Sequence, residues 1–351
     1  MMKKTSLFTL IFCLTLAGCA TVPLKPASSV PISIPNTIRE MKSPGFWIKQ
    51  HPYPDKLILD ESGVALFNAK IEKELNFIIN PLNESPQYNG KKLKNDLAKE
   101  FNSFSKRKLY VRNGKLADKN FYNLIEPNMN LSILGEKIDA RYGFLLHYAD
   151  QRLLPVNASL NISVGDLEFD ELQNSSLDAG TPLIILHETK DGFWVYAESL
   201  SSSGWLEKEK IVYCEAQEFK DVLTKKNFVV VISAKADIFL DESLTKYYDY
   251  VRMGAKFIFN ETANPKVFEI LIPAKTEDNK FFMRKAYIKK ENANIGYLSY
   301  TPRNIIEQAF KLFNAPYGWG GTGGEQDCSS YMQEIFQTVG ITLPRNSSAQ
   351  G

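Results

Sequence analysis

A cysteine in a glycine-rich stretch is the residue of this sequence best suited to covalent chemistry. Cys328 directly follows Asp327, and five glycines lie within the ten residues before it. Downstream, apolar residues recur at helical spacing until Gly340, so the pattern predicts a helix that begins near Cys328. A thiol in the first turn of a helix lies among unpaired backbone N–H groups at the positive end of the helix dipole, which favours a nucleophilic thiolate. We also expect the glycines to let a substrate backbone approach closely. The alternative from the residues alone is a buried structural cysteine behind an ordinary loop.

The remaining cysteines and the histidines are weaker candidates for catalysis or metal binding. Cys214 follows a short apolar run and is expected to be a small core residue, although a disulfide with Cys328 is possible in an oxidising compartment and would block the nucleophile. The three histidines, His51, His147 and His187, have no metal-ligand spacing with one another or with a cysteine. We therefore predict neither a metal nor a cofactor.

Three motif blocks resemble the catalytic core of the NlpC family. They are residues 316–321 (Pro-Tyr-Gly-Trp-Gly-Gly), 327–330 (Asp-Cys-Ser-Ser) and 343–347 (Leu-Pro-Arg-Asn-Ser). Members of this family are papain-like cysteine peptidases that cut the stem peptides of bacterial peptidoglycan. The resemblance implies that Cys328 is the nucleophile. It also implies that the Tyr317 hydroxyl helps the backbone N–H of Cys328 to stabilise the oxyanion, and one such donor is worth about 3 kcal/mol.

The resemblance further implies a subsite for the substrate's amino end. In related enzymes, the positions of Asp327 and Ser329 hold the free α-amine of a stem peptide that begins with L-Ala, and Ser347 or Ser348 is a further candidate for this pocket. For Asp327, an ordinary helix N-cap is an equally good interpretation. Ser330 departs from the more usual glycine after the Asp-Cys-Ser trio, which we expect to narrow the site slightly.

The general base is missing from the motifs. A papain-like site needs a histidine to take the thiol proton and a third polar group to orient it. In the family both lie on a sheet C-terminal to the cysteine helix, whereas no histidine follows Cys328 here. We therefore expect a fragment or truncated product of a longer enzyme, inactive as written. The complete enzyme would hydrolyse the γ-D-glutamyl–diamino acid bond. The alternative is a non-catalytic, lipid-anchored peptidoglycan-binding protein.

The N-terminus has the pattern of an export signal. Lys3 and Lys4 precede an apolar stretch over 7–16, and residues 16–19 (Leu-Ala-Gly-Cys) resemble a bacterial lipobox. This implies cleavage before Cys19 and acylation of Cys19, with a plain secretory signal as the alternative. Ala20 is typical of sorting to the outer membrane. We expect an exported lipoprotein at the periplasmic face, with 1–18 as signal peptide and 19–35 as lipidated cysteine and tether.

Composition and patterning place the rest of the chain in several soluble modules. The net charge of the 351 residues is +2 and no basic stripe stands out, so nucleic acid is not an expected partner. The fold class that we predict is α+β multidomain. The helical pattern of 36–138 resembles the stabilising segment of multidomain family members, and the two runs of short strands, 139–218 and 225–300, resemble small SH3-like β-barrels. The same resemblance implies that 301–351 is the helical first half of a papain-like α+β peptidase domain.

Particular residues support these modules. Asp191-Gly192 between two apolar runs predicts a β-hairpin. Tyr196 on that hairpin is a candidate for limiting entry to the active site, by resemblance to related enzymes, although ordinary packing is the stronger interpretation. Thr301 followed by Pro302 predicts a helix start.

Overall fold

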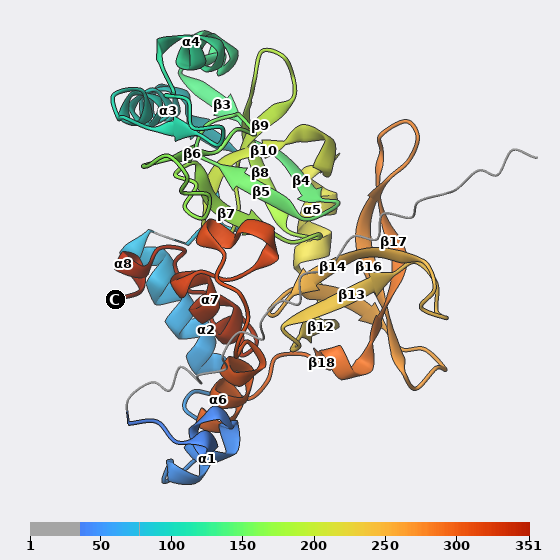
Figure 1. Cartoon of the computed structure of the whole chain (residues 1–351). Helices are drawn as coiled ribbons and strands as arrows, with labels where there is room; N and C mark the ends of the chain where they lie inside the picture. Colours follow the sequence, from blue (N-terminus) through green and yellow to red (C-terminus); the bar gives the residue numbers. More distant parts are fainter. Residues whose placement is uncertain (1–35, 77) are drawn as a thin grey trace, which may run out of the picture. The chain divides into compact units, whose positions relative to one another are not determined.

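The computed structural model describes residues 36–76 and 78–351, in two units, Met1–Lys42 and Ser43–Gly351 (Figure 1). The predicted signal peptide, the lipidated Cys19 and the tether over 19–35 lie outside the described residues. In the first unit, the described part forms one short 3-10 turn, η1 (Arg39–Lys42). The second unit combines helices with two seven-stranded antiparallel sheets and two small two-stranded sheets, which confirms a mixed α and β fold.

Among the described residues before the first large sheet there are four α-helices, in agreement with the mainly helical segment predicted over 36–138. They are α1 (Pro44–Gln50), α2 (Glu61–Lys70), α3 (Gly90–Ser105) and α4 (Lys119–Asn128). Each begins at a Ser, Asp or Asn whose side chain accepts a backbone N–H of the first turn. A π-helical turn, η2 (Ile71–Leu75), continues α2, and η3 (Leu131–Ile133) follows α4. The two-stranded sheets pair β1 (Gln87–Asn89) with β3 (Lys137–Asp139), and β2 (Tyr110–Val111) with β6 (Leu160–Asn161).

The first large sheet has the strand order β11-β4-β8-β9-β10-β5-β7. Its strands are β4 (Arg141–Leu145), β5 (Ala149–Arg152), β7 (Gln173–Leu177), β8 (Pro182–Glu188), β9 (Trp194–Glu198), β10 (Ser203–Glu207) and β11 (Ile211–Cys214). The hairpin between β8 and β9 confirms the Asp191-Gly192 prediction, and Gly192 has a φ of +74°. Among the described residues, β11 and β7 are not paired with each other, so a closed barrel stays a prediction.

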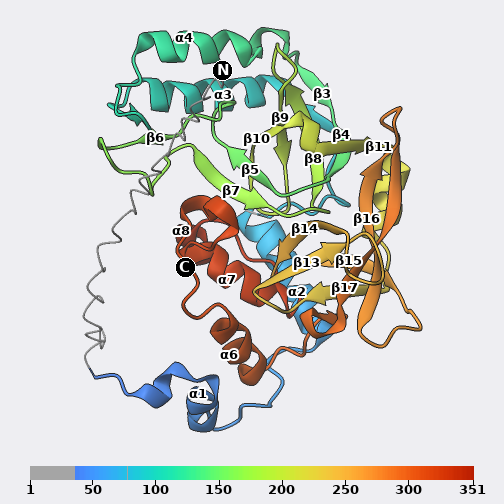
Figure 2. The same ribbon diagram turned by 45° about the vertical axis from the view of Figure 1, so that its right-hand side comes forward.

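Helices α3 and α4 share one hydrophobic core with this sheet. The rings of Trp194 and Trp205, from β9 and β10, pack in the same cluster as Leu97 and Phe101 of α3 and Ile125 of α4. Figures 1 and 2 both show α3 and α4 side by side next to these strands. The stabilising segment therefore covers the sheet through shared apolar burial, which is the main favourable contribution to such packing.

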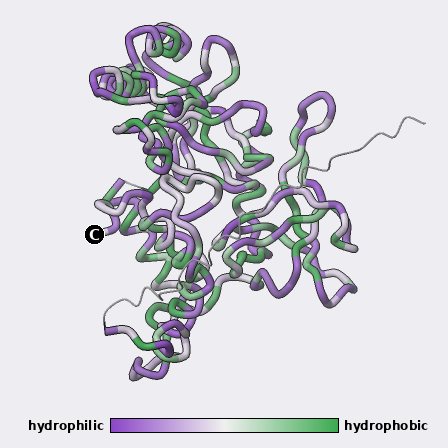
Figure 3. The backbone as a smooth tube through the Cα atoms, in the orientation of Figure 1, coloured by the Kyte–Doolittle hydropathy of each residue, from purple (hydrophilic) through white to green (hydrophobic). Residues whose placement is uncertain are grey.

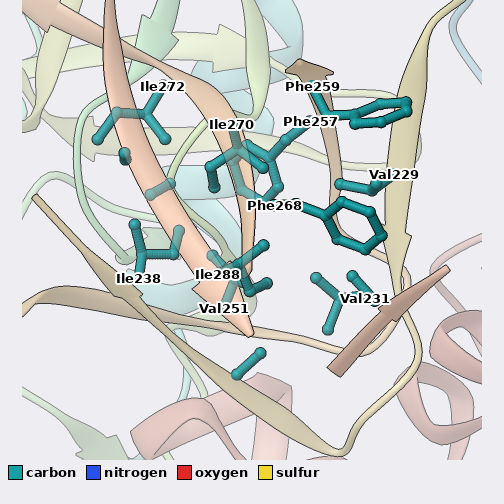
Figure 4. Packing of buried hydrophobic residues seen from close by; sticks show 14 residues of the cluster. Val229, Val231, Ile238, Val251, Phe257, Phe259, Phe268, Ile270, Ile272 and Ile288 are labelled. Carbon is teal, nitrogen blue, oxygen red and sulfur yellow. The ribbon is translucent and has the colours of Figure 1, made fainter. Parts of the chain in front are cut away.

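The second large sheet has the strand order β14-β13-β17-β16-β15-β12-β18. Its strands are β12 (Phe228–Val231), β13 (Lys235–Phe239), β14 (Tyr247–Arg252), β15 (Lys256–Asn260), β16 (Val267–Lys275), β17 (Phe281–Lys289) and β18 (Ala293–Ile295). Figure 4 shows its core of valine, isoleucine and phenylalanine side chains. The alternation of apolar with polar residues in β13 is typical of a half-buried strand and was missed, whereas β14 is rich in tyrosine and charged residues without a clear alternation. The sheet ends with β18, since the chain leaves this strand at Gly296, whose φ is +67°.

Short elements complete the described chain. Helix α5 (Ala216–Leu223) links the two large sheets, and the turns η4 (Lys208–Lys210) and η5 (Lys290–Asn292) precede β11 and β18. The long hairpin loop between β16 and β17 is hydrophilic, while the strands are mostly hydrophobic (Figure 3). Over 36–76 and 78–351, no helix combines the length and apolarity that a bilayer crossing requires.

Candidate active site

Two helices frame the cysteine, as the sequence predicts. Helix α6 (Pro302–Lys311) begins after Thr301, whose hydroxyl accepts the backbone N–H of Asn304 at 3.2 Å. Helix α7 (Cys328–Gln337) begins at Cys328 itself, which is exposed in the first turn. The chain leaves α7 through Gly340, whose φ of +82° suits glycine. A thiol is therefore presented to solvent at the N-terminal end of a helix.

Asp327 is the N-cap of α7 and one half of a buried ion pair. Its carboxylate accepts the backbone N–H groups of Ser329 and Ser330 at 3.2 and 2.8 Å. The guanidinium of Arg345 lies 2.7 Å from the other carboxylate oxygen, and both residues are buried. Burial alone would raise the pKa of Asp327, but the hydrogen bond and charge of Arg345 bring it below its ordinary value. Asp327 is therefore a carboxylate at neutral pH.

The two serines after the nucleophile are part of the same network. The hydroxyl of Ser329 lies 3.1 Å from Asp327 Oδ1 and accepts Arg345 Nη1 at 2.8 Å. The hydroxyl of Ser330 accepts the backbone N–H of Asp327 at 2.9 Å, which completes a capping box. This contact gives Ser330 a structural use at the position where glycine is more usual. The N-cap interpretation of Asp327 thus has direct support, and its predicted contact with a substrate amine stays a prediction.

Arg345 was not predicted as a site residue, although the sequence holds a signal for it. It is the only Lys or Arg after Lys311, and it lies in the third motif block. Among residues close to Asp327 in the sequence, it is thus the only cation that could balance the negative charge of a buried carboxylate. Its Nε also donates to the Ser175 hydroxyl on β7 at 3.0 Å, so it ties the cysteine helix to the first sheet.

Tyr317 lies at the rim of the site, with 57% of its surface exposed. Its backbone pairs with that of Gln326, two residues before the nucleophile. Burial, followed by the charges of Asp327 and of a Cys328 thiolate, raises the pKa of Tyr317. Its hydroxyl therefore keeps its proton at neutral pH and can donate to a developing oxyanion.

An aromatic residue of the region between β6 and β7 borders the same rim. The ring of Phe169 lies 6.4 Å from the ring of Tyr317 and 5.3 Å, edge to face, from that of Trp319. The position of Phe169 gives the site an apolar wall on this side.

The glycine-rich turn η6 (Trp319–Gly324) lies against both large sheets. A Cβ on Gly320 would lie 2.5 Å from the Gln173 carbonyl oxygen, and one on Gly321 would lie 2.0 Å from the Ser176 hydroxyl oxygen. A Cβ on Gly324 would lie 2.0 Å from a tyrosine hydroxyl of β14. The prediction that these three glycines make room for substrate is therefore wrong, because protein atoms fill that space.

Two tyrosines hold this turn, Tyr148 from the loop before β5 and Tyr250 from β14. The Tyr148 hydroxyl lies 3.0 Å from the Gly321 carbonyl oxygen and accepts the backbone N–H of Gly324 at 3.2 Å. The Tyr250 hydroxyl lies 3.5 Å from the carbonyl oxygen of Gly323. The sheets thus position the segment that leads to the nucleophile.

The structure does not bring Tyr196 into this cluster. Its hydroxyl donates to the Ser203 hydroxyl at 3.0 Å and its ring packs on Trp205. Burial raises its pKa to about 12. These contacts give Tyr196 a packing role within the first sheet, and a role in substrate binding stays a prediction without a contact to support it.

Ser347 lies closer to the nucleophile helix. It is exposed and begins the short helix α8 (Ser347–Gln350). Gln350, at the end of this turn, donates to the Ser329 carbonyl oxygen at 3.1 Å, so α8 is held against the start of α7. The predicted contact between Ser347 and a substrate amine remains a prediction.

The other cysteine and the histidines lie elsewhere. Cys214 and Cys328 are both free, and burial raises the pKa of Cys214 to about 12. His187 lies 2.8 Å from the Met129 carbonyl oxygen, and His147 lies 3.2 Å from a carboxylate oxygen of the second sheet. None of the three histidines, all of which are described, contacts Cys328. Among the described residues, no group of three or more His, Cys, Asp or Glu side chains could hold a metal ion.

Comparison with known proteins identifies two modules. Residues 158–207 match the SH3 domain of the SH3b1 type, and residues 314–351 match the NlpC/P60 family. The chain thus contains an SH3 domain and a segment of NlpC/P60 sequence that includes Tyr317, Cys328 and Arg345.

Individual relatives agree with this assignment. The chain is 27% identical over 156 residues to the gamma-D-glutamyl-L-lysine dipeptidyl-peptidase of Bacillus cereus, a match that covers 42% of each protein. It is 34% identical over 70 residues to the bifunctional muramidase/DL-endopeptidase CwlT of Bacillus subtilis, which covers 18% of this chain and 21% of that protein. The chain thus spans less than half the length of either relative.

A solved structure shares the fold. It is an NlpC/P60 endopeptidase from Photobacterium damselae subsp. piscicida, with a TM-score of 0.70 and 22% identity. The match covers 87% of this chain and 68% of that chain.

Proposed function

We propose that this protein is a cysteine endopeptidase of peptidoglycan stem peptides, with Cys328 as nucleophile and the γ-D-glutamyl–diamino acid bond as its target. The observation that carries the proposal is the exposed thiol in the first turn of α7, directly after the ion-paired Asp327 and within the NlpC/P60 match. The names of two relatives, a gamma-D-glutamyl-L-lysine dipeptidyl-peptidase and a DL-endopeptidase, support the substrate class.

The chemistry assigned to each residue is simple. The Cys328 thiolate attacks the carbonyl carbon of the scissile amide, and the oxyanion that forms accepts hydrogen bonds from the backbone N–H of Cys328 and the hydroxyl of Tyr317. Collapse of this intermediate breaks the C–N bond, the nitrogen takes up the proton that the thiol released, and the amine of the diamino acid leaves. Water then hydrolyses the thioester that remains on Cys328, which frees the carboxylic acid and the thiol. Papain-like sites use a histidine to take the thiol proton, and the described histidines do not supply that contact.

A second candidate function follows from the SH3 match over 158–207. The protein would bind peptidoglycan without cutting it, and the two sheets would be the binding modules. In either case we propose that both sheets are SH3-like modules that shape the site, because Tyr148 and Tyr250 hold the turn before the nucleophile.

One experiment distinguishes these functions. The protein expressed from its whole reading frame, so that a general base absent from residues 1–351 can be present, is incubated with purified muropeptides that contain diaminopimelate, and the products are analysed by mass spectrometry. We expect peptide release by the wild type, its loss in Cys328→Ala and its retention in the control Cys214→Ala. Release that persists in Cys328→Ala would show that the nucleophile is wrongly assigned. Sedimentation with peptidoglycan sacculi without any release would establish the binding protein instead.

We also propose that the protein is an exported lipoprotein that is acylated at Cys19 and sorted to the outer membrane. The support is the lipobox-like sequence at residues 16–19. Globomycin should cause the unprocessed precursor to accumulate. Processing that is unchanged by globomycin and by Cys19→Ser would refute the anchor.

A further inference from the structure

A buried carboxyl group lies on α7 six residues after the nucleophile. Glu334 is 6% exposed, and its Oε1 lies 3.6 Å from Nη1 of the equally buried Arg252 on β14. Arg252 is also paired with Asp178, at 3.1 Å, in the turn that follows β7. This polar cluster therefore joins the cysteine helix to both large sheets.

Glu334 also contacts the segment that carries the site residues. The Gln326 side chain donates through Nε2 to Glu334 Oε2 at 2.8 Å. The Gln326 backbone pairs with Tyr317 and accepts the Gly318 N–H at 3.0 Å. Since Gln326 precedes Cys328 by two residues, a change at Glu334 reaches both Tyr317 and the nucleophile through one side chain.

The Gln326–Glu334 pair is incompletely satisfied in the present arrangement. Among the described residues, Glu334 Oε1 and Gln326 Oε1 are buried and have no hydrogen-bond partner. A protonated Glu334 can donate to Gln326 Oε1 once the amide turns over, whereas the carboxylate requires the amide N–H group that it has now. Glu334 also lines a cavity of about 450 Å³ on this side of α7, which gives the side chains room to rearrange.

The charged groups around Glu334 act in opposite directions. Burial raises the pKa of Glu334 to about 8, Arg252 opposes this, Asp178 adds to it, and Lys235 of β13 opposes it more weakly. Lys235 is itself paired with Glu325. The exchange of the proton thus falls in the pH range in which an ordinary cysteine, with a pKa of about 8.5, ionises.

We propose that Glu334 is a positioning residue for Cys328. Its protonation switches the hydrogen bond with Gln326 between two arrangements and so changes the placement of the segment that carries Tyr317 and the nucleophile. The biological meaning rests on the proposed peptidase function. The proposal itself concerns the reactivity of the thiol, so it can fail while the peptidase function stands. Equally, the peptidase function can fail while Glu334 still positions the thiol.

The test is the pH profile of Cys328 alkylation. Iodoacetamide is added to the full chain between pH 6 and pH 10, and modification of each cysteine is followed by peptide mass spectrometry. We expect two inflections for Cys328 in the wild type, one from the thiol and one from Glu334. Glu334→Gln should leave a single ionisation, and a wild-type profile with a single ionisation would overturn the proposal without any variant.

Two further variants separate the positioning effect from a direct charge effect. Six helical residues place Glu334 about 9 Å from Cys328 along the axis. At that distance a charge changes an ionisation equilibrium about twofold in a water-like medium, and roughly twentyfold at the effective permittivity of about 20 that applies to buried groups. Gln326→Ala leaves Glu334 free to titrate but removes the hydrogen bond that connects Glu334 to the segment before Cys328, so it should also abolish the second inflection. Persistence of that inflection would overturn the proposal. Glu325→Gln, which removes a neighbouring charge, should keep both inflections, and their loss in this control would attribute the effect to general electrostatics.

Discussion

Replacement of Arg345 tests how the nucleophile helix is held in place. Arg345→Met removes the guanidinium and keeps most of the side-chain length. The wild-type arginine makes two hydrogen bonds to Asp327, at 2.7 and 3.2 Å, and one each to Ser329 and Ser175. Removal of one partner from a buried ion pair costs about 3–5 kcal/mol. Because Asp327 keeps hydrogen bonds from three backbone N–H groups and a serine hydroxyl, we expect the low end, about 3 kcal/mol.

The pH dependence of this loss has a definite sign. Arg345 holds the pKa of Asp327 below its ordinary value, so the pair stabilises the fold above that ordinary value and the contribution is lost as the pH falls through the folded pKa. In Arg345→Met, burial acts on the pKa of Asp327 without this opposition and raises it. The deficit of the variant should therefore shrink on acidification from pH 7 towards pH 4.

The assay is hydrogen exchange of the α7 amides. Several modules make one global unfolding free energy a poor measure, whereas exchange reports the local opening of a single helix. After correction for intrinsic exchange rates, about 3 kcal/mol corresponds to a loss of protection of roughly 100-fold at pH 7. The control Arg303→Met breaks an exposed pair with Asp55 and should leave α7 unchanged. A loss below about fivefold, or a loss that grows on acidification, would refute the reasoning.

Three further predictions use matched positions. Gly321→Ala should destabilise the fold by about 2–4 kcal/mol, because its Cβ would lie 2.0 Å from a serine hydroxyl oxygen of β7. Gly323→Ala has open space and should lose only about 1 kcal/mol to its positive φ; equal melting temperatures would contradict this difference. Iodoacetamide at pH 8 should modify the exposed Cys328 well before the half-buried Cys214, whose pKa is raised to about 12, and the reverse order in peptide mass spectra would be incompatible with the site. Tyr196→Phe should lower stability by about 1 kcal/mol through one hydroxyl contact, and a change in KM for muropeptides without a change in melting temperature would instead support its predicted substrate role.

Local signals in the sequence were sufficient for much of the nucleophile segment. The start of α6 is specified by Thr301-Pro302 and the start of α7 by Asp327, and Gly340 marks where the chain turns away after α7. These signals can be read from the sequence because helix caps and glycines with positive φ act within a few residues. The Asp191-Gly192 hairpin is predictable for the same reason.

Other features depended on contacts between residues far apart in the chain. Strand β14 is stabilised by pairing with β13 and by the shared core of the second sheet, and its run of tyrosine and charged residues has no clear alternation that would indicate a strand. The glycines of η6 face β7 and β14, so only the assembled sheets show that they make room for protein atoms and not for substrate.

The sequence by itself determined the nucleophile candidate, its helix and the module order, because each depends on neighbouring residues or on short motifs. Only the tertiary structure decided which group balances the negative charge of the buried Asp327. Its partner Arg345 is 18 residues away, and a third partner of that arginine, Ser175, is 170 residues away. It also decided that Tyr196 packs on Trp205 and bonds to Ser203, and that Glu334 lies buried between Arg252 and Gln326. Burial and long-range charge pairs arise only when distant segments pack together, and they set the pKa values and the rigidity of the site.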